Sequence, residues 1–315
     1  MRALVTGAAG FVGRHLVAEL LSRGHVLGGV VHPTDGGRGS LGPRIEVFAI
    51  DILDDAALEG AFQRFEPDAV FHLAAFSNPE GSWKEARRTL ETNVIGAHNL
   101  LSAANESRRR PRVLLVGSAQ QYGDVPPEEQ PISEEREQKP LTPYAVSKTT
   151  QEILGRRAFW SGELPVYLTR SFNHTGPGQS DTYVASSFAR QVAEVESGAR
   201  EPSIRVGNLT ARRDFTDVRD VAAAYAAIVE RGEAGRPYNV CRGEAVAMGD
   251  VLSELVRQSR VPVQVVVDPE RYHAVDAPLI VGDPKRLETD TGWSPRYSLS
   301  ETLRDLLDDW RARLR

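Results

Sequence analysis

Residues 2–13 of the chain read RALVTGAAGFVG, and this stretch decides the fold. The short apolar run 2–6 predicts a buried strand, and a glycine-rich turn follows it directly. After the turn, apolar residues recur at helical spacing as far as Leu21, and Gly24 can end that helix as a C-terminal cap. The stretch therefore predicts a strand, a tight turn and a helix in immediate succession.

The three glycines of this turn have separate physical roles. Gly7 permits the tight turn, Gly10 lets the backbone approach a pyrophosphate, and Gly13 lets the helix pack close to the strand. The helix start offers free N–H groups and the positive end of the helix dipole to an anion. In this context the glycine pattern indicates a dinucleotide-binding unit.

Length and composition narrow the class of protein. The chain has 315 residues, 41% of them hydrophobic, which suffices for one large domain or a large and a small one. The net charge is −5 and the only basic cluster is 108–110, so we expect no nucleic acid partner. A single cysteine, Cys241, excludes an internal disulfide and a cysteine-based metal site.

No apolar run approaches the length of a membrane span, and the first residues lead straight into a strand. We therefore expect a cytoplasmic protein that does not contact a membrane, and no metal centre.

Strand and helix patterns alternate along the first half of the chain. Further strands are expected at 25–31, 45–50, 69–73, 112–116 and 166–170, with a long helix over 83–107. This alternation predicts an α/β fold with a Rossmann-like, doubly wound parallel sheet. After Arg170 the strands shorten and the connections lengthen, and residues 208–217 read as a loop.

The change at Arg170 suggests a division of the chain. Residues 1–170 form an NAD(P)-binding Rossmann domain to which parts of 207–240 return. Residues 171–315 form mostly a smaller, mixed α/β cap that binds the substrate.

A helix that carries two candidate catalytic residues is predicted to follow Thr142, which is a good N-cap, with Pro143 at the first helical position. Tyr144 and Lys148 then lie about one turn apart on one face. A phenol with a pKa of about 10 is a weak acid near neutrality, and a neighbouring ammonium lowers that pKa. Ser118 follows the fifth strand, at the sheet edge where open α/β folds bind ligands.

Several other residues are candidates for cofactor contacts. The second strand ends near His32. The nearest acid, Asp35, lies beyond the position at which NAD-binding folds usually place a carboxylate for the ribose 2′-OH. Arg38 could instead contact a 2′-phosphate, so NADPH is slightly favoured over NADH. Asp51 either accepts from the adenine amino group or caps a helix. Asn93 either anchors the active-site side of the sheet or bonds to backbone. His72 reads as a core histidine.

Taken together, the sequence resembles an extended short-chain dehydrogenase/reductase of the NAD-dependent epimerase/dehydratase family that acts on nucleotide sugars. The motifs that carry this resemblance are Gly7-x-x-Gly10-x-x-Gly13, Asp51-Ile52, His72-Leu73-Ala74-Ala75, Asn93, Ser118 before Tyr122-Gly123, and Tyr144-x-x-x-Lys148. The resemblance implies that Tyr144 is the general acid/base. It also implies that Lys148 holds the nicotinamide ribose and lowers the phenol pKa, and that Ser118 hydrogen-bonds the reacting oxygen.

On these grounds we expect one set of residues to contact the cofactor: Gly7, Gly10, Phe11, Val12, Gly13, His32, Arg38, Asp51, Ile52, Leu73, Ala74, Ala75, Asn93, Tyr144, Lys148 and Phe172. A second set is expected to contact the substrate: Ser77, Ser118, Gln120, Asn173, Arg190, Asn208, Arg213, Arg271 and His273.

Within the family, the segments 170–179, 206–209, 213–220, 282–284 and 291–293 are similar to reductases of GDP-4-keto-6-deoxy-D-mannose, which implies GDP-D-rhamnose as product. Related dehydratases carry Asp-Glu after the active-site serine or threonine, to expel water. Here those positions are Ala119 and Gln120, which cannot do acid/base work, so carbonyl reduction is favoured over dehydration.

One segment departs from the family pattern. Relatives place an Arg-Pro-x-Asp/Glu clamp for the diphosphate where this chain has residues 273–276, HAVD. Arg271 or Arg213 could take over that clamp, or the nucleotide differs. The resemblance also implies a homodimer through a four-helix interface built around the helices of Asn93 and Tyr144.

Two other functions remain open from the sequence. A nucleotide-sugar 4-epimerase would use the same triad and keep NAD tightly bound. A cofactor-sensing regulatory protein on the same fold is a third hypothesis, but such proteins typically lose the tyrosine or the lysine, and this chain has both.

Overall fold

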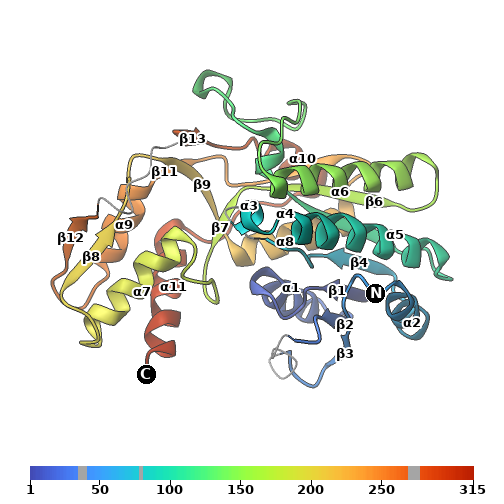
Figure 1. Cartoon of the computed structure of the whole chain (residues 1–315), viewed down its shortest axis with the longest axis horizontal. Coiled ribbons are helices and arrows are strands. Elements are labelled where there is room, and N and C mark those ends of the chain that lie inside the picture. The colour runs from blue at the N-terminus through green and yellow to red at the C-terminus, as the bar shows by residue number, and fades with distance from the viewer. Residues whose placement is uncertain (35–40, 78–80, 269–276) are drawn as a thin grey trace.

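A computed structural model describes residues 1–34, 41–77, 81–268 and 277–315 (Figure 1). Its centre is a seven-stranded sheet, parallel throughout, with the strand order β10-β6-β5-β4-β1-β2-β3. The strands are β1 (Arg2–Thr6), β2 (Val26–Val31), β3 (Ile45–Ala49), β4 (Ala69–His72), β5 (Arg112–Ser118), β6 (Val166–Ser171) and β10 (Pro237–Val240). The prediction of a Rossmann-like, doubly wound parallel sheet is confirmed.

Helices cover both faces of this sheet, as a parallel sheet with apolar side chains on both faces requires. On one face lie α1 (Phe11–Ser22), α8 (Val218–Arg231) and α10 (Lys285–Thr291), and their apolar residues share one core cluster with the strands. On the other face lie α2 (Asp55–Phe65), α5 (Gly96–Glu106) and α6 (Pro143–Trp160), which share a second cluster. The sheet thus forms the middle of three layers.

The expected continuous helix over 83–107 is wrong in detail. The structure has α3 (Gly81–Lys84), α4 (Ala86–Leu90), a π-helical turn (Glu91–Ile95) and then α5. A π turn holds an extra residue relative to the α-helix, and such turns recur at functional sites. Here the turn contains the fully buried Asn93.

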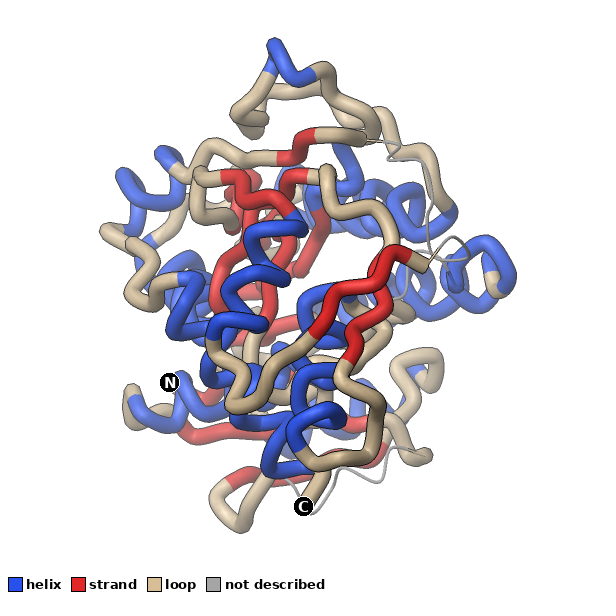
Figure 2. Tube along the Cα trace, turned by 90° about the vertical axis from the view of Figure 1, so that its left-hand side faces the viewer, coloured by secondary structure: helices blue, strands red, loops and turns tan. Residues whose placement is uncertain are grey.

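Beyond the main sheet, a smaller region contains two further sheets. In one, β9 (Arg212–Asp217) pairs with β7 (Asn173–Thr175), β11 (Ala245–Ala247) and β13 (Leu279–Ile280); in the other, β8 (Ser203–Val206) pairs with β12 (Gln264–Val267). Helices α7 (Val184–Glu196), α9 (Met248–Arg257) and α11 (Leu299–Arg313) enclose a third core cluster. Figure 2 views the molecule from the side of this region.

The loop expected over 208–217 is therefore wrong for its second half, which is strand β9. The strand carries few apolar residues, so its sequence gives little β signal. It forms because it pairs with strands distant in the chain, and the buried Asp214 carboxylate accepts from the backbone N–H groups of Arg242 and Gly243.

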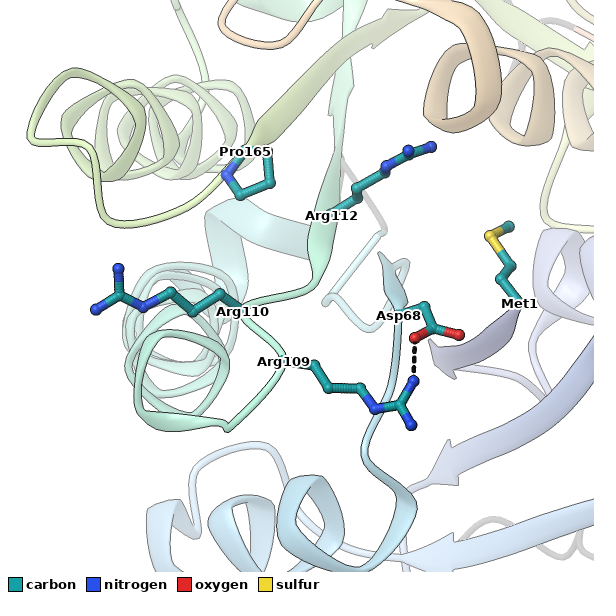
Figure 3. A pocket seen from close by; sticks show the side chains of 6 residues that line it. All are labelled: Met1, Asp68, Arg109, Arg110, Arg112 and Pro165. Atoms are coloured by element: carbon teal, nitrogen blue, oxygen red, sulfur yellow. Dashed lines mark hydrogen bonds and ion pairs between the residues drawn. The ribbon is translucent and has the colours of Figure 1, made fainter.

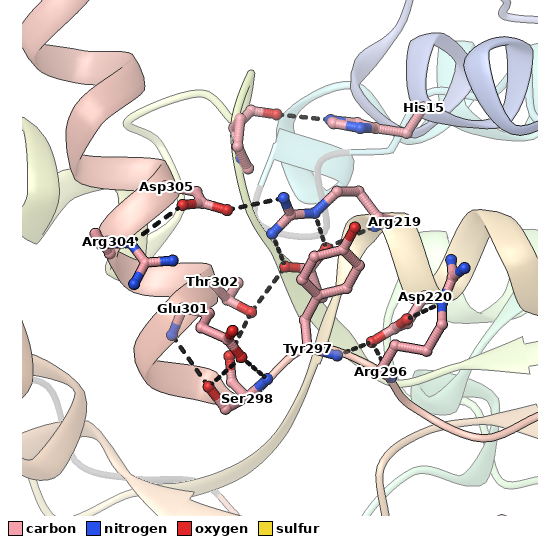
Figure 4. A network of polar contacts seen from close by, with 12 residues as sticks. His15, Arg219, Asp220, Arg296, Tyr297, Ser298, Glu301, Thr302, Arg304 and Asp305 are labelled. Atoms are coloured by element: carbon pink, nitrogen blue, oxygen red, sulfur yellow. Dashed lines mark hydrogen bonds and ion pairs between the residues drawn. The ribbon is translucent and has the colours of Figure 1, made fainter.

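A polar network joins α8, α11 and the sheet side of the molecule (Figure 4). The Arg219 guanidinium donates to Asp217 at 2.7 Å and to Asp305 of α11 at 2.8 Å, and it lies 3.6 Å from the ring centre of Tyr297. His15 of α1 hydrogen-bonds the carbonyl of Pro177 at 2.8 Å. Helix α1 is thereby joined to the turn that follows β7.

Within the described ranges, none of the helices is both long and apolar enough to span a bilayer. The same part of the chain contains no cluster of three His, Cys, Asp or Glu side chains suited to a metal ion.

Candidate active site

The glycine-rich turn brings backbone close to backbone at the carboxyl end of β1. Gly7 has φ +68°, and a Cβ there would lie 2.9 Å from the backbone nitrogen of Ala74. A Cβ at Gly13 would lie 2.1 Å from the carbonyl oxygen of Gly7. Gly10 is the N-cap of α1 and no side chain caps the helix, so its first N–H groups are available to a pyrophosphate. These features fit a nicotinamide dinucleotide.

The next two residues of the turn differ in surroundings. The ring of Phe11 stacks on His174 with centroids 6.0 Å apart. Val12 packs against the core cluster of this sheet face.

At the end of β2, His32 lies 3.5 Å from the carboxylate of Asp51, and both side chains are about half exposed. Asp51 also accepts from the backbone N–H of Leu53, whereas Asp54 is the N-cap of α2. The Ile52 side chain is buried against Gly96, so only its backbone could contact a ligand. Arg38, expected nearby, lies outside the described residues.

The segment after β4 is fixed to β1 and to the π turn. The Thr6 hydroxyl accepts from the N–H of Ala74 at 3.1 Å and contacts His72 Nδ1 at 2.8 Å. His72 is fully buried, which lowers its pKa to about 3, so it is neutral and belongs to the core. Leu73 and Ala75, half-buried, lie beside Ala74 at this edge.

Asn93 makes both kinds of contact that the sequence left open. Its Oδ1 accepts from the N–H of Phe76 at 2.7 Å, and its Nδ2 donates to the carbonyl of Phe76 at 3.1 Å. The same amide donates to the hydroxyl of Ser147 in α6 at 2.9 Å. Asn93 thus anchors the segment after β4 to the helix of Tyr144, a link through Ser147 that the sequence did not indicate.

Helix α6 begins as predicted. The Thr142 hydroxyl accepts from the N–H of Ala145 at 3.0 Å, and Pro143 occupies the first helical position. Tyr144 then lies near the end of β5, where the Ser118 side chain is close enough to its phenol to oppose the rise in the phenol pKa. The Ser118 oxygen also accepts from the N–H of Gln120 at 3.2 Å, which leaves the serine proton free to be donated.

Lys148 is 3% exposed, and its ammonium donates to the carbonyl of Val116 at 2.8 Å and to Gln151 Oε1 at 3.0 Å. Burial lowers the pKa of Lys148 to about 7. The pKa of Tyr144 is raised to about 12, because burial and the nearby Tyr183 outweigh the hydrogen bond from Ser118. Lys148 does not lower the pKa of the phenol in this structure, in contrast to the expectation, because its ammonium donates to Val116 and Gln151.

The residues expected to contact substrate lie in several places. Ser77, Gln120 and Asn173 are exposed. Asn208 accepts from the N–H and hydroxyl of Thr210, at 2.9 and 2.8 Å. The Arg213 guanidinium donates to the carbonyls of Arg212 and Ala277.

The remaining candidates are engaged elsewhere or not described. Arg190 pairs with Asp181 and with Glu194, so two carboxylates already neutralise its charge. Phe172 is 3% exposed and packs in a separate apolar cluster with Tyr122, so its ring does not face the site. Arg271 and His273 lie outside the described residues.

A cavity of about 400 Å³ lies away from this edge, at the amino ends of β1, β4 and β5 (Figure 3). Its lining consists of Met1, Asp68, Arg109, Arg110, Arg112 and Pro165. Arg109 pairs with Asp68, and the other two arginines point in different directions. The cavity contains none of the candidate residues.

Comparison with known proteins places this geometry in a family. The family model described as GDP-mannose 4,6 dehydratase matches residues 4–306. The chain belongs to this family. The resemblance to the NAD-dependent epimerases and dehydratases is thereby confirmed.

Individual members of the family show the same relationship. The chain is 35% identical over 314 residues to GDP-6-deoxy-D-mannose reductase of Pseudomonas aeruginosa, covering 100% of this chain and 98% of the relative. A structure of RMD from Pseudomonas aeruginosa complexed with NADPH has a TM-score of 0.86 at 32% identity, over 99% and 98% of the two chains. A UDP-glucose 4-epimerase of Thermus thermophilus in complex with NAD also has a TM-score of 0.86, at 28% identity over 99% of each chain.

Proposed function

We propose that this protein reduces the 4-keto group of a nucleotide-linked 4-keto-6-deoxyhexose, converting GDP-4-keto-6-deoxy-D-mannose to GDP-D-rhamnose with NADPH or NADH. The observation that carries the proposal is that Ser118, at the end of β5, lies near the Tyr144 phenol. The two residues after Ser118 are Ala119 and Gln120, where a dehydratase would carry carboxylates. The full-length similarity to a GDP-6-deoxy-D-mannose reductase supports the same substrate class.

The cofactor, when bound, supplies the hydride to the keto carbon. The Gly7 turn and the start of α1 would hold the pyrophosphate of the cofactor. His32, Asp51 and the segment Leu73–Ala75 would line the rest of the cofactor site. Lys148 would lie near the nicotinamide ribose. An NADPH complex of one structural relative and an NAD complex of another support this cofactor class.

Tyr144 supplies the proton. With its pKa raised to about 12 the phenol is protonated near neutrality, as an acid in a carbonyl reduction has to be. When substrate is bound, the Ser118 hydroxyl would donate its proton to the same substrate oxygen and stabilise the negative charge that develops there.

On the substrate side, Arg213 is the described residue best suited to the diphosphate, because an arginine fork fits phosphate oxygens. Asn173 and Asn208 would contact the sugar phosphate. We accordingly assign residues 1–170, with parts of 207–240 returning to them, to cofactor binding, and residues 171–315 mostly to substrate binding.

The test is a screen of GDP-, dTDP-, UDP- and CDP-linked 4-keto-6-deoxy sugars with NADH and NADPH. Loss of reduced-cofactor absorbance reports turnover, and NMR of the product reports its configuration. We expect the GDP sugar with NADPH to react fastest. Formation of a 4-keto sugar from GDP-mannose would instead assign a dehydratase.

A nucleotide-sugar 4-epimerase is the second candidate, because epimerases with bound NAD share the whole fold. An epimerase re-reduces its own intermediate and retains its cofactor. Protein that is purified with NAD and interconverts sugars without added NADPH would therefore replace the reductase assignment.

We also infer that the protein is a cytoplasmic homodimer. Ala97 and Leu101 of α5 are buried within the chain and so do not face a partner. The exposed apolar side chains of α4, the π turn and α6 support an interface instead: Leu90, Ile95, Val146, Ile153 and Trp160. Light scattering should give a dimer that Ile153→Asp converts to a monomer. A monomeric wild-type protein at micromolar concentration would contradict this interface.

A further inference from the structure

A buried polar cluster lies directly beneath the turn that carries Ser118, and the proposed chemistry does not use it. Its central members are Gln121, Glu152 and Arg170, which are 0%, 4% and 3% exposed. Buried polar side chains are costly unless they are fully hydrogen-bonded, so such a cluster calls for an explanation.

The carboxamide of Gln121 connects two parts of the site. Its Oε1 accepts from the backbone N–H of Ser118 at 2.7 Å, and its Nε2 donates to Glu152 Oε2 at 2.8 Å. The orientation of the amide follows from its partners, because an N–H must meet an acceptor and a carboxylate can only accept.

Glu152 is itself rigidly held. Arg170 donates through Nη2 to Oε1 at 2.7 Å and through Nε to Oε2 at 3.0 Å, a two-pronged contact. Burial acts to raise the pKa of Glu152, but the hydrogen bonds and charges of Arg170 and Arg156 lower it overall. The carboxylate is therefore ionised and available as an acceptor near neutrality.

Glu152 lies on the same helix as Tyr144 and Lys148. Glu152 lies on α6, eight residues after Tyr144 and four after Lys148, so all three share one face. Ser118 ends β5. The Gln121 amide therefore spans from the strand that presents the serine to the helix that presents the tyrosine.

The backbone beneath the turn leaves room for this amide. A Cβ on Gly117 would lie 2.3 Å from Gln121 Oε1 and 2.2 Å from the carbonyl of Thr169. Glycine at this position thus lets the amide reach the Ser118 N–H.

We propose that Gln121 is a positioning residue, whose amide holds Ser118 in register with Tyr144 by linking the Ser118 N–H to Glu152 on α6. The proposal rests on the proposed reduction. It assigns to Gln121 no contact with substrate or cofactor.

The decisive variants are Gln121→Met, which keeps the side-chain length but removes the hydrogen bonds to Ser118, Glu152 and Gln138, and Gln121→Glu. Gln121→Met should lower kcat for the 4-keto sugar by about tenfold or more and leave the KM for NADPH unchanged. Gln138→Met is the matched control, because Gln138 donates to Glu152 at 2.8 Å and accepts from Gln121 Nε2 at 3.3 Å but makes no hydrogen bond to Ser118, so the link from Ser118 through Gln121 to Glu152 remains. It should match Gln121→Met in its effect on the melting temperature and keep the wild-type kcat.

Gln121→Glu adds a readout that a purely structural role would not change. A protonated glutamic acid can accept from the Ser118 N–H and donate to Glu152, as the amide does, whereas the ionised form repels Glu152. The kcat of Gln121→Glu relative to wild type should rise as the pH falls from 8 to about 6, while the ratio for Gln121→Met stays constant. Hydrogen exchange of the peptide covering 117–122 should be faster in Gln121→Met and unchanged in Gln138→Met.

Two failures can be told apart. If the wild-type protein reduces no 4-keto sugar, the proposed function is wrong. If it does reduce such a sugar, the positioning role is wrong in either of two cases. In one, Gln121→Met keeps the wild-type kcat. In the other, Gln121→Met and Gln138→Met lower kcat by the same factor, in step with equal losses of stability.

Discussion

The carboxyl edge of the seven-stranded sheet and the neighbouring region of β7 and β9 hold their candidate residues in different ways. At the sheet edge Lys148 and Asn93 are buried, and each makes hydrogen bonds to backbone and to another side chain. In the second region Asn173 is exposed, and Arg213 donates to two backbone carbonyls. The sheet edge is thus held by buried side-chain contacts, whereas in the second region Asn173 is exposed and Arg213 is held by backbone carbonyls.

This difference predicts which kinetic constant each region controls. Variants at the sheet edge should change kcat, because their interactions matter in the transition state. Variants in the β9 region should change the KM for the sugar nucleotide.

The largest effect is expected for Tyr144→Phe, which keeps the ring and removes the proton. General acid catalysis contributes about 10²–10⁴-fold, so kcat should fall by that order. The KM for NADPH should not change, since the pyrophosphate and ribose contacts remain. Steady-state kinetics on protein with an unaltered circular dichroism spectrum provide the measurement, and turnover at the wild-type rate would remove Tyr144 from the mechanism.

The sheet edge is also where the sequence was most informative. The strand Arg2–Thr6 and the helix after the glycine turn match the structure, because the glycine turn and apolar periodicity are local signals. The Thr142 cap and the spacing of Tyr144 and Lys148 are local as well.

The features that the sequence could not indicate depend on contacts between residues that are far apart along the chain. Gln121 and Glu152 stand 31 residues apart along the chain, and no spacing rule joins them. Asn93 of the π turn likewise bonds to Phe76 and Ser147, which are 17 and 54 residues away in the chain. The strand β9 exists because β7, β11 and β13 pair with it. The pKa of Tyr144 follows burial, which the pattern of the helix alone does not reveal.

The charge of Arg213 should affect binding of the sugar nucleotide more than the chemistry. Within the described ranges Arg213 has no carboxylate partner, so its charge is left for an anion. Because charge-assisted hydrogen bonds contribute about 1.5–3 kcal/mol, Arg213→Ala should raise the KM for the sugar nucleotide by about tenfold or more. Neither kcat nor the KM for NADPH should change appreciably.

Arg212→Ala is the control for Arg213→Ala, because it removes the same charge from an exposed neighbour whose guanidinium donates to the carbonyl of Ala245. It should leave all three constants near their wild-type values. An unchanged sugar-nucleotide KM in Arg213→Ala, or a changed KM for NADPH, would mean that the β9 region is not the diphosphate site. The GDP assignment would then be the first to be abandoned.

The smallest effect is expected at Glu254, which joins α9 to α11 in the smaller region and is not among the candidate site residues. Its carboxylate on α9 accepts from Arg257 at 2.6 Å and from Ser300 of α11 at 2.5 Å. These bonds, with Arg257 the main cause, lower the pKa of Glu254 from 4.5 to about 2. A carboxyl whose pKa is lower in the folded state stabilises the fold above its unfolded pKa, and this contribution is lost as the pH falls through the folded pKa.

Glu254→Gln should therefore lower the free energy of unfolding by about 1 kcal/mol near neutral pH, the scale of a partly exposed ion pair. The difference from wild type should shrink as the pH falls from about 4.5 to about 2, because wild-type Glu254 becomes protonated over that range. Urea unfolding at several pH values measures this difference, and Glu288→Gln, an exposed glutamate of α10, should show none. The kinetic constants of Glu254→Gln should match wild type, which separates stabilisation of the second region from recognition by Arg213. A difference that persists at pH 2 would show that packing between α9 and α11, rather than the ionised carboxylate, provides the stability.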